Sequence, residues 1–390
     1  MKAATMYLQM DEPELIRSGA LHTAREIAQQ PASWDRTAAL VREQRAQLDA
    51  WLAPLLARAE LRIILTGAGS SAFIGECLAP TLSRQLGRQV LAIATTDLLT
   101  GPREYLLPDV PTLLVSFGRS GSSPESVAVV ELAEQLLREC YQLVFTCNEA
   151  GALYQRCRGR ARNLALLMPA ETHDQSFAMT SSFSSMMLAA LLAFAGNEAL
   201  ADGRALARLG EGARAVLDRH HAALRELASH AYARVVYLGS NALKAIAREA
   251  ALKLLELTDG QVVASHESSL GFRHGPKTIV TGDTLLLMFL SNDPYTRRYD
   301  LDLLRELRED GRAAAVLAIS AQPQDAATAG RCLHLAGLDA AADCELAFPY
   351  VVCAQLYALH RALRLGIRPD EPSVSGTVSR VVRGVTIHPL

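Results

Sequence analysis

A serine-rich loop at residues 117–126 holds the densest group of side chains that can bind an anion. Pro124 suits the first position of a helix and Ser123 suits its N-cap, so the spacing predicts a helix that begins there. The free N–H groups and the dipole of that helix favour an anion, and Arg119 and Gly121 add a charge and close backbone approach. We therefore expect a cradle for a phosphate monoester. The alternative is a serine-rich turn without a ligand.

Two further hydroxyl clusters stand at predicted helix starts. Residues 67–72 form a glycine turn that presents Ser70 and Ser71, and ordinary helix capping is the alternative interpretation. The turn resembles the start of a dinucleotide-binding fingerprint, but Ala72 replaces the third glycine, which argues against a nicotinamide cofactor. Residues 180–185 are mainly a helix start, and we expect one or two of them to reach a ligand.

Acid–base chemistry is indicated by a predicted helix at residues 241–258. Glu249, Lys253 and Glu256 have the spacing i, i+4 and i+7 and therefore share one face. A solvated stripe with a single Glu–Lys pair is the alternative. The apolar residues of the other face, and the position of the helix after a strand, favour an active site.

A histidine follows in a loop bounded by glycine and proline, at residues 268–276. An isolated histidine is more often structural than catalytic. His274, held between rigid turns and close in sequence to the carboxylates, is nevertheless a candidate for proton transfer at neutral pH.

An internal duplication supplies the elements that position these groups. The run at residues 62–67 recurs at 234–239, and the run at 112–117 recurs at 284–289, with the same offset of 172 residues. We infer two homologous halves of about 170 residues each. The loop at 290–295 has lost the hydroxyl cluster of its counterpart, which predicts that the second half does not bind phosphate.

Short apolar runs alternate with helical patterns in the first half. The predicted strands are Arg62–Thr66, Val90–Ala94, Leu113–Phe117, Gln142–Phe145 and Asn163–Leu167. Continuous apolar runs are typical of parallel strands with helices on both faces of the sheet. Ligands bind at the carboxyl ends of such strands, where the loops described above lie.

Composition excludes several other classes of protein. The chain has 390 residues with 39 Lys plus Arg against 41 Asp plus Glu and only 5% aromatic residues, which argues against nucleic-acid binding. No segment reaches the roughly 20 apolar residues that span a membrane. The seven cysteines include no Cys-x-x-Cys pair, so we expect neither disulfides nor a metal site, and a cytoplasmic location.

With these motifs the chain resembles tandem sugar isomerase (SIS) domain proteins, and specifically the AgaS family of amino-sugar-phosphate deaminase/isomerases. The resemblance extends to the stretches 23–31 and 376–386. It implies an α/β fold with two tandem, doubly wound, flavodoxin-like parallel sheets. The implied segments are a helical N-terminal segment (1–45), a phosphate-binding SIS domain (46–210), an SIS domain with the acid–base residues (211–372) and a tail that closes the site (373–390).

The isomerase half of glucosamine-6-phosphate synthase is a more distant relative with the same layout. By similarity, Ser120 and Ser123 hold the sugar phosphate. The further contacts implied by the resemblance are Ser70, Ser71 and Thr180. Arg119 stands where that relative has a glutamine.

The resemblance also assigns the acid–base residues. Glu249, Lys253 and Glu256 match the relative's Glu–Lys–Glu helix, and His274 matches its ring-opening histidine. Arg383 aligns with a Schiff-base lysine. An arginine does not form that imine, so we expect no covalent catalysis by the tail.

The implied activity is the conversion of D-galactosamine 6-phosphate into D-tagatose 6-phosphate and ammonia in amino sugar catabolism. We expect a hydrolase/isomerase that acts as a homodimer, without a metal or an organic cofactor. The alternatives within enzymes are an aldose–ketose isomerase of tagatose 6-phosphate and a glucosamine-6-phosphate deaminase. The alternative of another class is a non-catalytic sugar-phosphate sensor.

Overall fold

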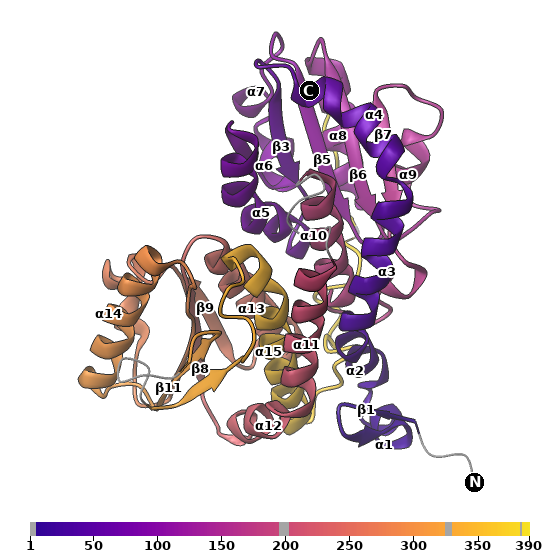
Figure 1. The fold of residues 1–390 in the computed structure, drawn as a ribbon. Helices are drawn as coiled ribbons and strands as arrows, with labels where there is room; N and C mark the ends of the chain where they lie inside the picture. The colour runs from indigo at the N-terminus through magenta and orange to yellow at the C-terminus, as the bar shows by residue number, and fades with distance from the viewer. Residues whose placement is uncertain (1–4, 195–202, 324–329, 383) are drawn as a thin grey trace. The chain divides into compact units, whose positions relative to one another are not determined.

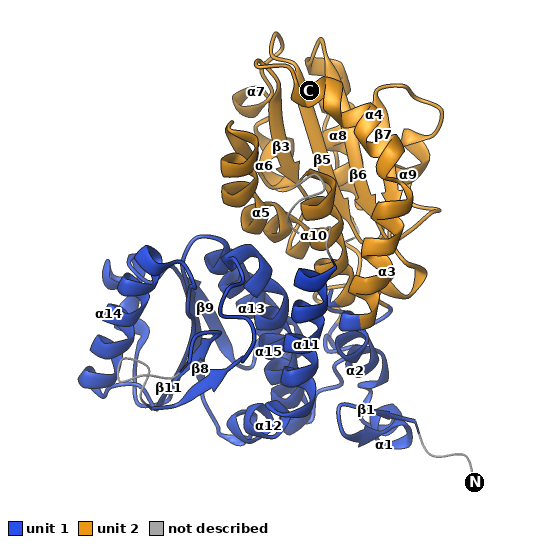
Figure 2. Cartoon of the chain, viewed as in Figure 1, with its two compact units in different colours: residues 1–31, 175–180, 203–375 blue, residues 32–174, 181–202, 376–390 orange. Residues whose placement is uncertain are grey.

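The computed structural model describes residues 5–194, 203–323, 330–382 and 384–390 (Figure 1). The chain divides into two compact units (Figure 2). Unit 1 comprises residues 1–31, 175–180 and 203–375. Unit 2 comprises residues 32–174, 181–202 and 376–390.

Unit 2 contains the first of the two predicted sheets. Its elements are α3 (Gln30–Glu43, whose start falls in unit 1), α4 (Arg45–Leu56), β3 (Arg62–Thr66), α5 (Ser70–Leu86), β4 (Val90–Ala92), α6 (Thr95–Thr100), α7 (Pro102–Tyr105), β5 (Thr112–Gly118), α8 (Pro124–Leu136), β6 (Cys140–Thr146), α9 (Ala152–Cys157), β7 (Asn163–Leu167), the 3-10 turn η1 (Ala170–Thr172) and α10 (Ser181–Phe194). All five strands predicted for the first half are confirmed.

The sheet of unit 2 is fully parallel with the strand order β4-β3-β5-β6-β7. This is the flavodoxin-like order, in which the chain changes direction across the sheet between β3 and β5. Thr66 at the end of β3 pairs with Ser116 of β5. The loops that follow these two strands therefore leave the sheet at the same edge.

Unit 1 contains the second sheet and the first helices of the chain. Its elements are β1 (Met6–Tyr7), β2 (Met10–Asp11), α1 (Glu12–Ser18), α2 (Leu21–Ala28), α11 (Arg204–Asp218), α12 (His221–Ser229), β8 (Arg234–Gly239), α13 (Ala242–Leu257), β9 (Val263–Glu267), η2 (Gly271–Arg273), η3 (Pro276–Ile279), β10 (Thr284–Phe289), α14 (Pro294–Asp310), β11 (Ala315–Ser320), β12 (Cys332–His334) and α15 (Asp343–Arg364). The order β9-β8-β10-β11-β12, again fully parallel, repeats that of unit 2.

The duplication is visible in the backbone as well as in the strand order. A Cβ on Gly67 would lie 2.5 Å from the carbonyl carbon of Ser71, and one on Gly239 would lie 2.5 Å from the carbonyl oxygen of Leu243. Each glycine thus allows the next helix to approach its strand closely. The following N-caps, Gly69 and Asn241, share an unusual positive φ of 56° and 51°.

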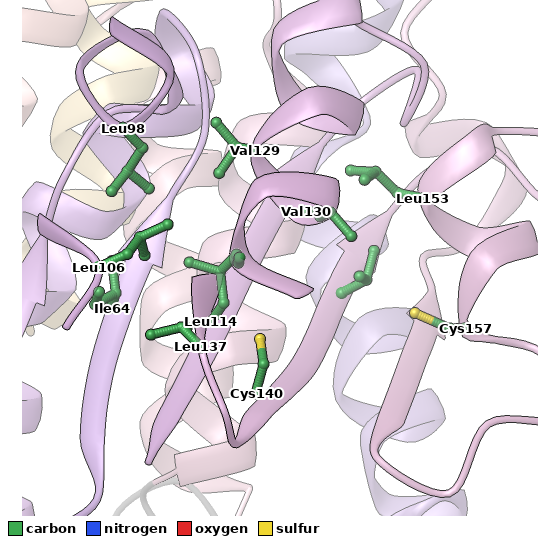
Figure 3. Close-up of a cluster of buried hydrophobic side chains, with 12 residues drawn as sticks. Ile64, Leu98, Leu106, Leu114, Val129, Val130, Leu137, Cys140, Leu153 and Cys157 are labelled. Atoms are coloured by element: carbon green, nitrogen blue, oxygen red, sulfur yellow. The ribbon is translucent and has the colours of Figure 1, made fainter. Parts of the chain in front are cut away.

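Each sheet is buried on both faces, as the continuous apolar runs predict. Leu113, Leu114 and Val115, consecutive in β5, are all fully buried. On one face of the unit 2 sheet, Leu114 packs in a cluster with side chains of α8 such as Val129 and Val130 (Figure 3). The matching cluster of unit 1 joins β8 and β10 to α14. Within the described residues, no helix combines the length and the apolar character needed to cross a bilayer.

Candidate active site

The loop between β5 and α8 has the geometry that its sequence predicts. Pro124 is the first residue of α8, and Ser123 is its N-cap, whose hydroxyl accepts from the backbone N–H of Ser126 at 3.3 Å. Gly121 has a φ of +59°, and a Cβ there would lie 2.8 Å from Oγ1 of Thr146. Only glycine fits this position without strain.

The end of β6 holds this loop in place. Oγ1 of Thr146 donates to the carbonyl oxygen of Gly118 at 2.7 Å, and Nδ2 of Asn148 donates to that of Ser120 at 2.9 Å. The side chains of Ser120 and Ser123 are half-buried at the start of α8. Fixed hydroxyl and backbone donors at a helix N-terminus suit a phosphate group.

Two arginines give this edge of the sheet a positive potential. Arg119 is buried, and its Nη2 donates to the backbone carbonyl of Arg380 at 2.8 Å. Nη2 of Arg380 donates in turn to the backbone carbonyl of Asp174. Burial, and then the charges of Arg380 and Arg119, lower the pKa of the neighbouring His173. The sequence analysis missed Arg380, which lies 261 residues from Arg119, and Arg383 lies outside the described residues.

The other predicted phosphate contacts fall in two places. Ser70 and Ser71 are buried at the start of α5, and the N-cap of α5 is Gly69, so neither serine caps the helix. They lie at the same edge of the sheet as the loop before α8, because β3 and β5 are neighbours. Thr180 is also buried, but it belongs to the segment 175–180 of unit 1.

The charged residues of α13 form one contiguous group within unit 1. Nζ of Lys253 forms an ion pair with Oε2 of Glu256 and lies 3.5 Å from Oε1 of Glu249. The side chains of Lys253 and Glu249 have no exposed surface, whereas that of Glu256 is 23% exposed. The interpretation as a solvated stripe is therefore wrong. Glu256 is the member of the group that solvent and a ligand can reach.

His274 lies between the turns η2 and η3 of unit 1. Gly275, with a φ of 117°, separates the histidine from η3. The ring is exposed, and it makes no hydrogen bond within the part of the chain that the structure describes. The imidazole is therefore accessible from solvent.

At the crossover of the second sheet, an internal carboxylate stands where unit 2 has its hydroxyl-rich loops. Oδ1 of Asp300 accepts from the hydroxyls of Ser240 and Ser269 at 2.6 and 2.5 Å, and Oδ2 accepts from the backbone N–H of Ser291 at 3.0 Å. Burial raises the pKa of this carboxyl group, and the three hydrogen bonds oppose that effect. The donors that follow β8 and β10 are therefore already engaged by an anion of the chain itself.

The predicted residues thus form two groups, one in each unit. Unit 2 brings together Ser70, Ser71, Arg119, Ser120 and Ser123. Unit 1 contains Glu249, Lys253 and Glu256 on α13, with His274 on a separate loop and Thr180 in the segment 175–180. Across the described ranges, no group of three or more His, Cys, Asp or Glu side chains is arranged to hold a metal ion.

Comparison with known proteins gives a consistent result. The model of the SIS domain matches residues 55–196 and 229–364. D-galactosamine-6-phosphate deaminase AgaS of Escherichia coli is 49% identical over 375 residues, which cover 94% of this chain and 95% of the relative.

Two solved structures are similar along most of the chain. The tagatose-6-phosphate ketose/aldose isomerase from Escherichia coli has a TM-score of 0.88 and 46% identity, covering 94% of this chain and 96% of its own. The C-terminal domain of glucosamine-fructose-6-phosphate aminotransferase from Francisella tularensis has a TM-score of 0.74 at 16% identity, covering 90% and 98%. The second likeness is one of fold.

Proposed function

The chain belongs to the SIS-domain family and, within it, to the AgaS deaminases, and from this membership we propose that it converts D-galactosamine 6-phosphate into D-tagatose 6-phosphate and ammonia. The observation that supports the chemistry is the group on α13. A buried Lys253 lies between two carboxylates, and one of them, Glu256, is accessible. Burying such charges costs free energy, and the arrangement is typical of a site that transfers protons.

The phosphate group of the substrate binds at the loop before α8. Ser120 and Ser123 donate hydroxyl hydrogen bonds, the N-terminus of α8 donates backbone N–H groups, and Arg119 adds a positive charge. Ser70 and Ser71, which follow the neighbouring strand β3 at the start of α5, supply further contacts to the phosphate. The resemblance assigns a further contact to Thr180. Anchoring the far end of the sugar holds its reacting carbons in place.

The reaction begins with opening of the sugar ring, which His274 assists. Glu256 then removes the proton from C2 of the open-chain amino aldehyde, O1 takes up a proton from water to give an enolamine, and Glu256 returns its proton to C1 while the amino group releases one to water, which leaves a CH2OH group at C1 and a ketimine at C2. Water adds to the ketimine, and ammonia leaves as the C2 ketone forms. Lys253 and Glu249 tune the charge on Glu256.

Ammonia release from galactosamine 6-phosphate, with glucosamine 6-phosphate alongside, tests this proposal. The wild-type protein should release ammonia from the galacto sugar, and Glu256→Gln should lower the rate by about 10²-fold or more while the variant remains folded. Release from the gluco sugar alone would contradict the substrate assignment. Binding of both sugars without turnover would indicate a sensor.

The E. coli isomerase structure favours one second candidate, an aldose–ketose isomerase of tagatose 6-phosphate. The same proton transfer between C2 and C1 serves that reaction when C2 carries a hydroxyl group in place of the amine. Interconversion of the ketose and aldose phosphates, with no ammonia from either amino sugar, would support it.

Three properties complete the proposal. The enzyme acts as a hydrolase in its last step, because water is consumed there. It forms a homodimer, which light scattering at several concentrations tests. It works in the cytoplasm, which agrees with the absence of any disulfide among its seven cysteines.

A further inference from the structure

The loop that carries His274 is tied on both sides to one carboxylate of α14. Nε of Arg273, directly before the histidine, lies 2.7 Å from Oε2 of Glu306. Nζ of Lys277, three residues after it, bonds to the other oxygen, Oε1. Lys277 also pairs with Asp310, one helical turn beyond Glu306. Both flanks of His274 thus end on Glu306, and the flank after the histidine also reaches Asp310.

The loop has few other anchors on its C-terminal side. Before His274, the fully buried Phe272 fixes η2 in the core of unit 1. After it, η3 contains no fully buried residue, and only its last residue, Ile279, packs against the core, which continues at Val280. Between His274 and Ile279, the ion pairs of Lys277 attach the loop to α14.

The helix that supplies the carboxylate is rigidly held. Leu303, Leu304 and Leu307 of α14 pack into the core. We call the ion pairs of Arg273 and Lys277 with α14 the clamp. Their side chains are 25–35% exposed, and exposed ion pairs contribute little to folding stability. Hydrogen bonds from Lys277 and Arg273 lower the pKa of Glu306, so its charge persists well below neutral pH. A carboxylate that stays charged but contributes little to folding stability suits a role in positioning the loop.

We propose that Glu306 is a positioning residue that holds His274 in place for ring opening. The inference rests on the proposed function, in which His274 acts on the sugar ring. Glu306→Gln preserves shape but leaves Arg273 with a neutral acceptor, while Lys277 keeps Asp310. The flank before His274 then loses its ionic partner, the loop keeps only the pair of Lys277 with Asp310, and a displacement of about 1 Å can reduce a rate by up to about 10²-fold.

A double-mutant cycle of Glu306→Gln and His274→Ala, read as ammonia release from galactosamine 6-phosphate, tests the proposal. We expect Glu306→Gln to lower kcat about tenfold, with KM changed less than about twofold. In the His274→Ala background the same change should have no further effect. Glu309→Gln is the matched control, because Glu309 is an exposed residue of the same helix.

Binding of an acyclic ligand separates positioning from a structural effect. The dissociation constant of 2-amino-2-deoxygalactitol 6-phosphate, which needs no ring opening, should be the same in Glu306→Gln and wild type. Weaker binding of this ligand, or an equal loss of kcat with and without His274, would overturn the proposal. If Glu306→Gln does not fold, the double variant R273Q/K277Q removes the clamp from the loop side and should show the same loss.

The outcomes distinguish this inference from the proposed function. A low rate in His274→Ala with a normal rate in Glu306→Gln overturns the inference alone. A normal rate in His274→Ala overturns the role of the histidine and the inference with it. Absence of ammonia from the wild-type protein overturns the proposed function itself.

Discussion

The ammonium group of Lys253 is shielded from solvent, and the two carboxylates beside it determine its role. Its Nζ contacts Glu256 and lies near Glu249, and no part of its side chain is exposed. Taking a charge out of water costs several kcal/mol, which close carboxylates offset. The two carboxylates thus fix the position of the ammonium group beside Glu256.

Replacing Lys253 with methionine should lower both the stability of the protein and the rate of ammonia release. Without the positive charge, two carboxylates on one helix face lose the cation that lies between them. We expect a loss of about 3–5 kcal/mol in stability and a fall in kcat of about 10²-fold. Urea denaturation checks the first effect, and ammonia release from galactosamine 6-phosphate by the folded variant checks the second.

Lys244→Met provides the control, because Lys244 lies on the same helix but is half exposed, with an ion pair to Glu267. Its stability and its rate of ammonia release should match those of the wild type. A wild-type rate in the folded Lys253→Met variant would show that the cation does not act on Glu256.

At the residue scale, the sequence predicts which side chains share a helix face but not which of them are buried. The intervals between Glu249, Lys253 and Glu256 placed them correctly on one helix face. That Glu249 and Lys253 are buried depends on packing with other parts of the chain, which the spacing within one helix does not reveal. Arg380 beside Arg119 was equally out of reach, because no local pattern connects residues 261 positions apart.

The loop between β5 and α8 acts as one element because Gly121 lets it turn sharply. Its positive φ is one that residues with a Cβ adopt at a cost, and Thr146 leaves no room for that atom. The hydroxyl of Thr146 also bonds to Gly118. Anything added at Gly121 therefore displaces the residue that fixes the start of the loop.

Gly121→Ala should impair both stability and substrate binding. The backbone conformation costs an alanine about 1–2 kcal/mol, and the contact with Thr146 adds to this. We expect KM for galactosamine 6-phosphate to rise about tenfold, equivalent to about 1.4 kcal/mol of binding. Steady-state kinetics and thermal unfolding measure the two effects.

Gly87→Ala measures the cost of the backbone conformation alone, without a contact such as that of Gly121 with Thr146. Gly87 ends α5 with a φ of +60°, and no atom lies within 4 Å of a Cβ at this position. It should lose stability without any change in KM. Equal kinetics in the two variants would contradict the role of the loop in phosphate binding.

The packing of α12 against α15 includes a buried histidine pair. Nε2 of His221 lies 2.8 Å from Nε2 of His360, so one ring donates to the other and at least one is neutral. Burial, followed by the charges of His221, Arg225 and Arg364, lowers the pKa of His360 to about 3. This contact therefore exists in the uncharged form at neutral pH.

Acid should destabilise the protein partly through His360. Its folded-state pKa lies below the unfolded value of 6.5, so the unfolded chain takes up the proton first as the pH falls. The group alone should cost about 2 kcal/mol between neutral pH and about pH 5. Urea denaturation at the two pH values should show a smaller loss in His360→Gln than in wild type.

Part of the pH dependence should survive in that variant. Burial also lowers the pKa of His173, His220, His221 and His266, so these groups act in the same direction. His230→Gln, at an exposed position, should leave the wild-type dependence unchanged. If His360→Gln behaves like this control, the histidine pair is not a source of acid sensitivity.

Over the whole molecule, duplication made the architecture predictable but not the difference between its halves. The runs repeated at an offset of 172 residues predicted two parallel sheets, and both have the same strand order. The loss of hydroxyls after β10 predicted that the second half does not bind phosphate. No sequence pattern revealed that Asp300 reaches back from α14 to donors that follow β8, β9 and β10.

We predict one anion site per chain from this asymmetry. In unit 1, Asp300 already accepts from the donors at the crossover, whereas the loop before α8 in unit 2 keeps its hydroxyl cluster. Calorimetric titration with 2-amino-2-deoxygalactitol 6-phosphate should therefore give a single bound ligand per chain. The variant S120A/S123A should lose this binding, and the unphosphorylated alditol should bind neither protein. Two ligands per chain, or one that persists in S120A/S123A, would place an anion site in unit 1 and contradict the closure by Asp300.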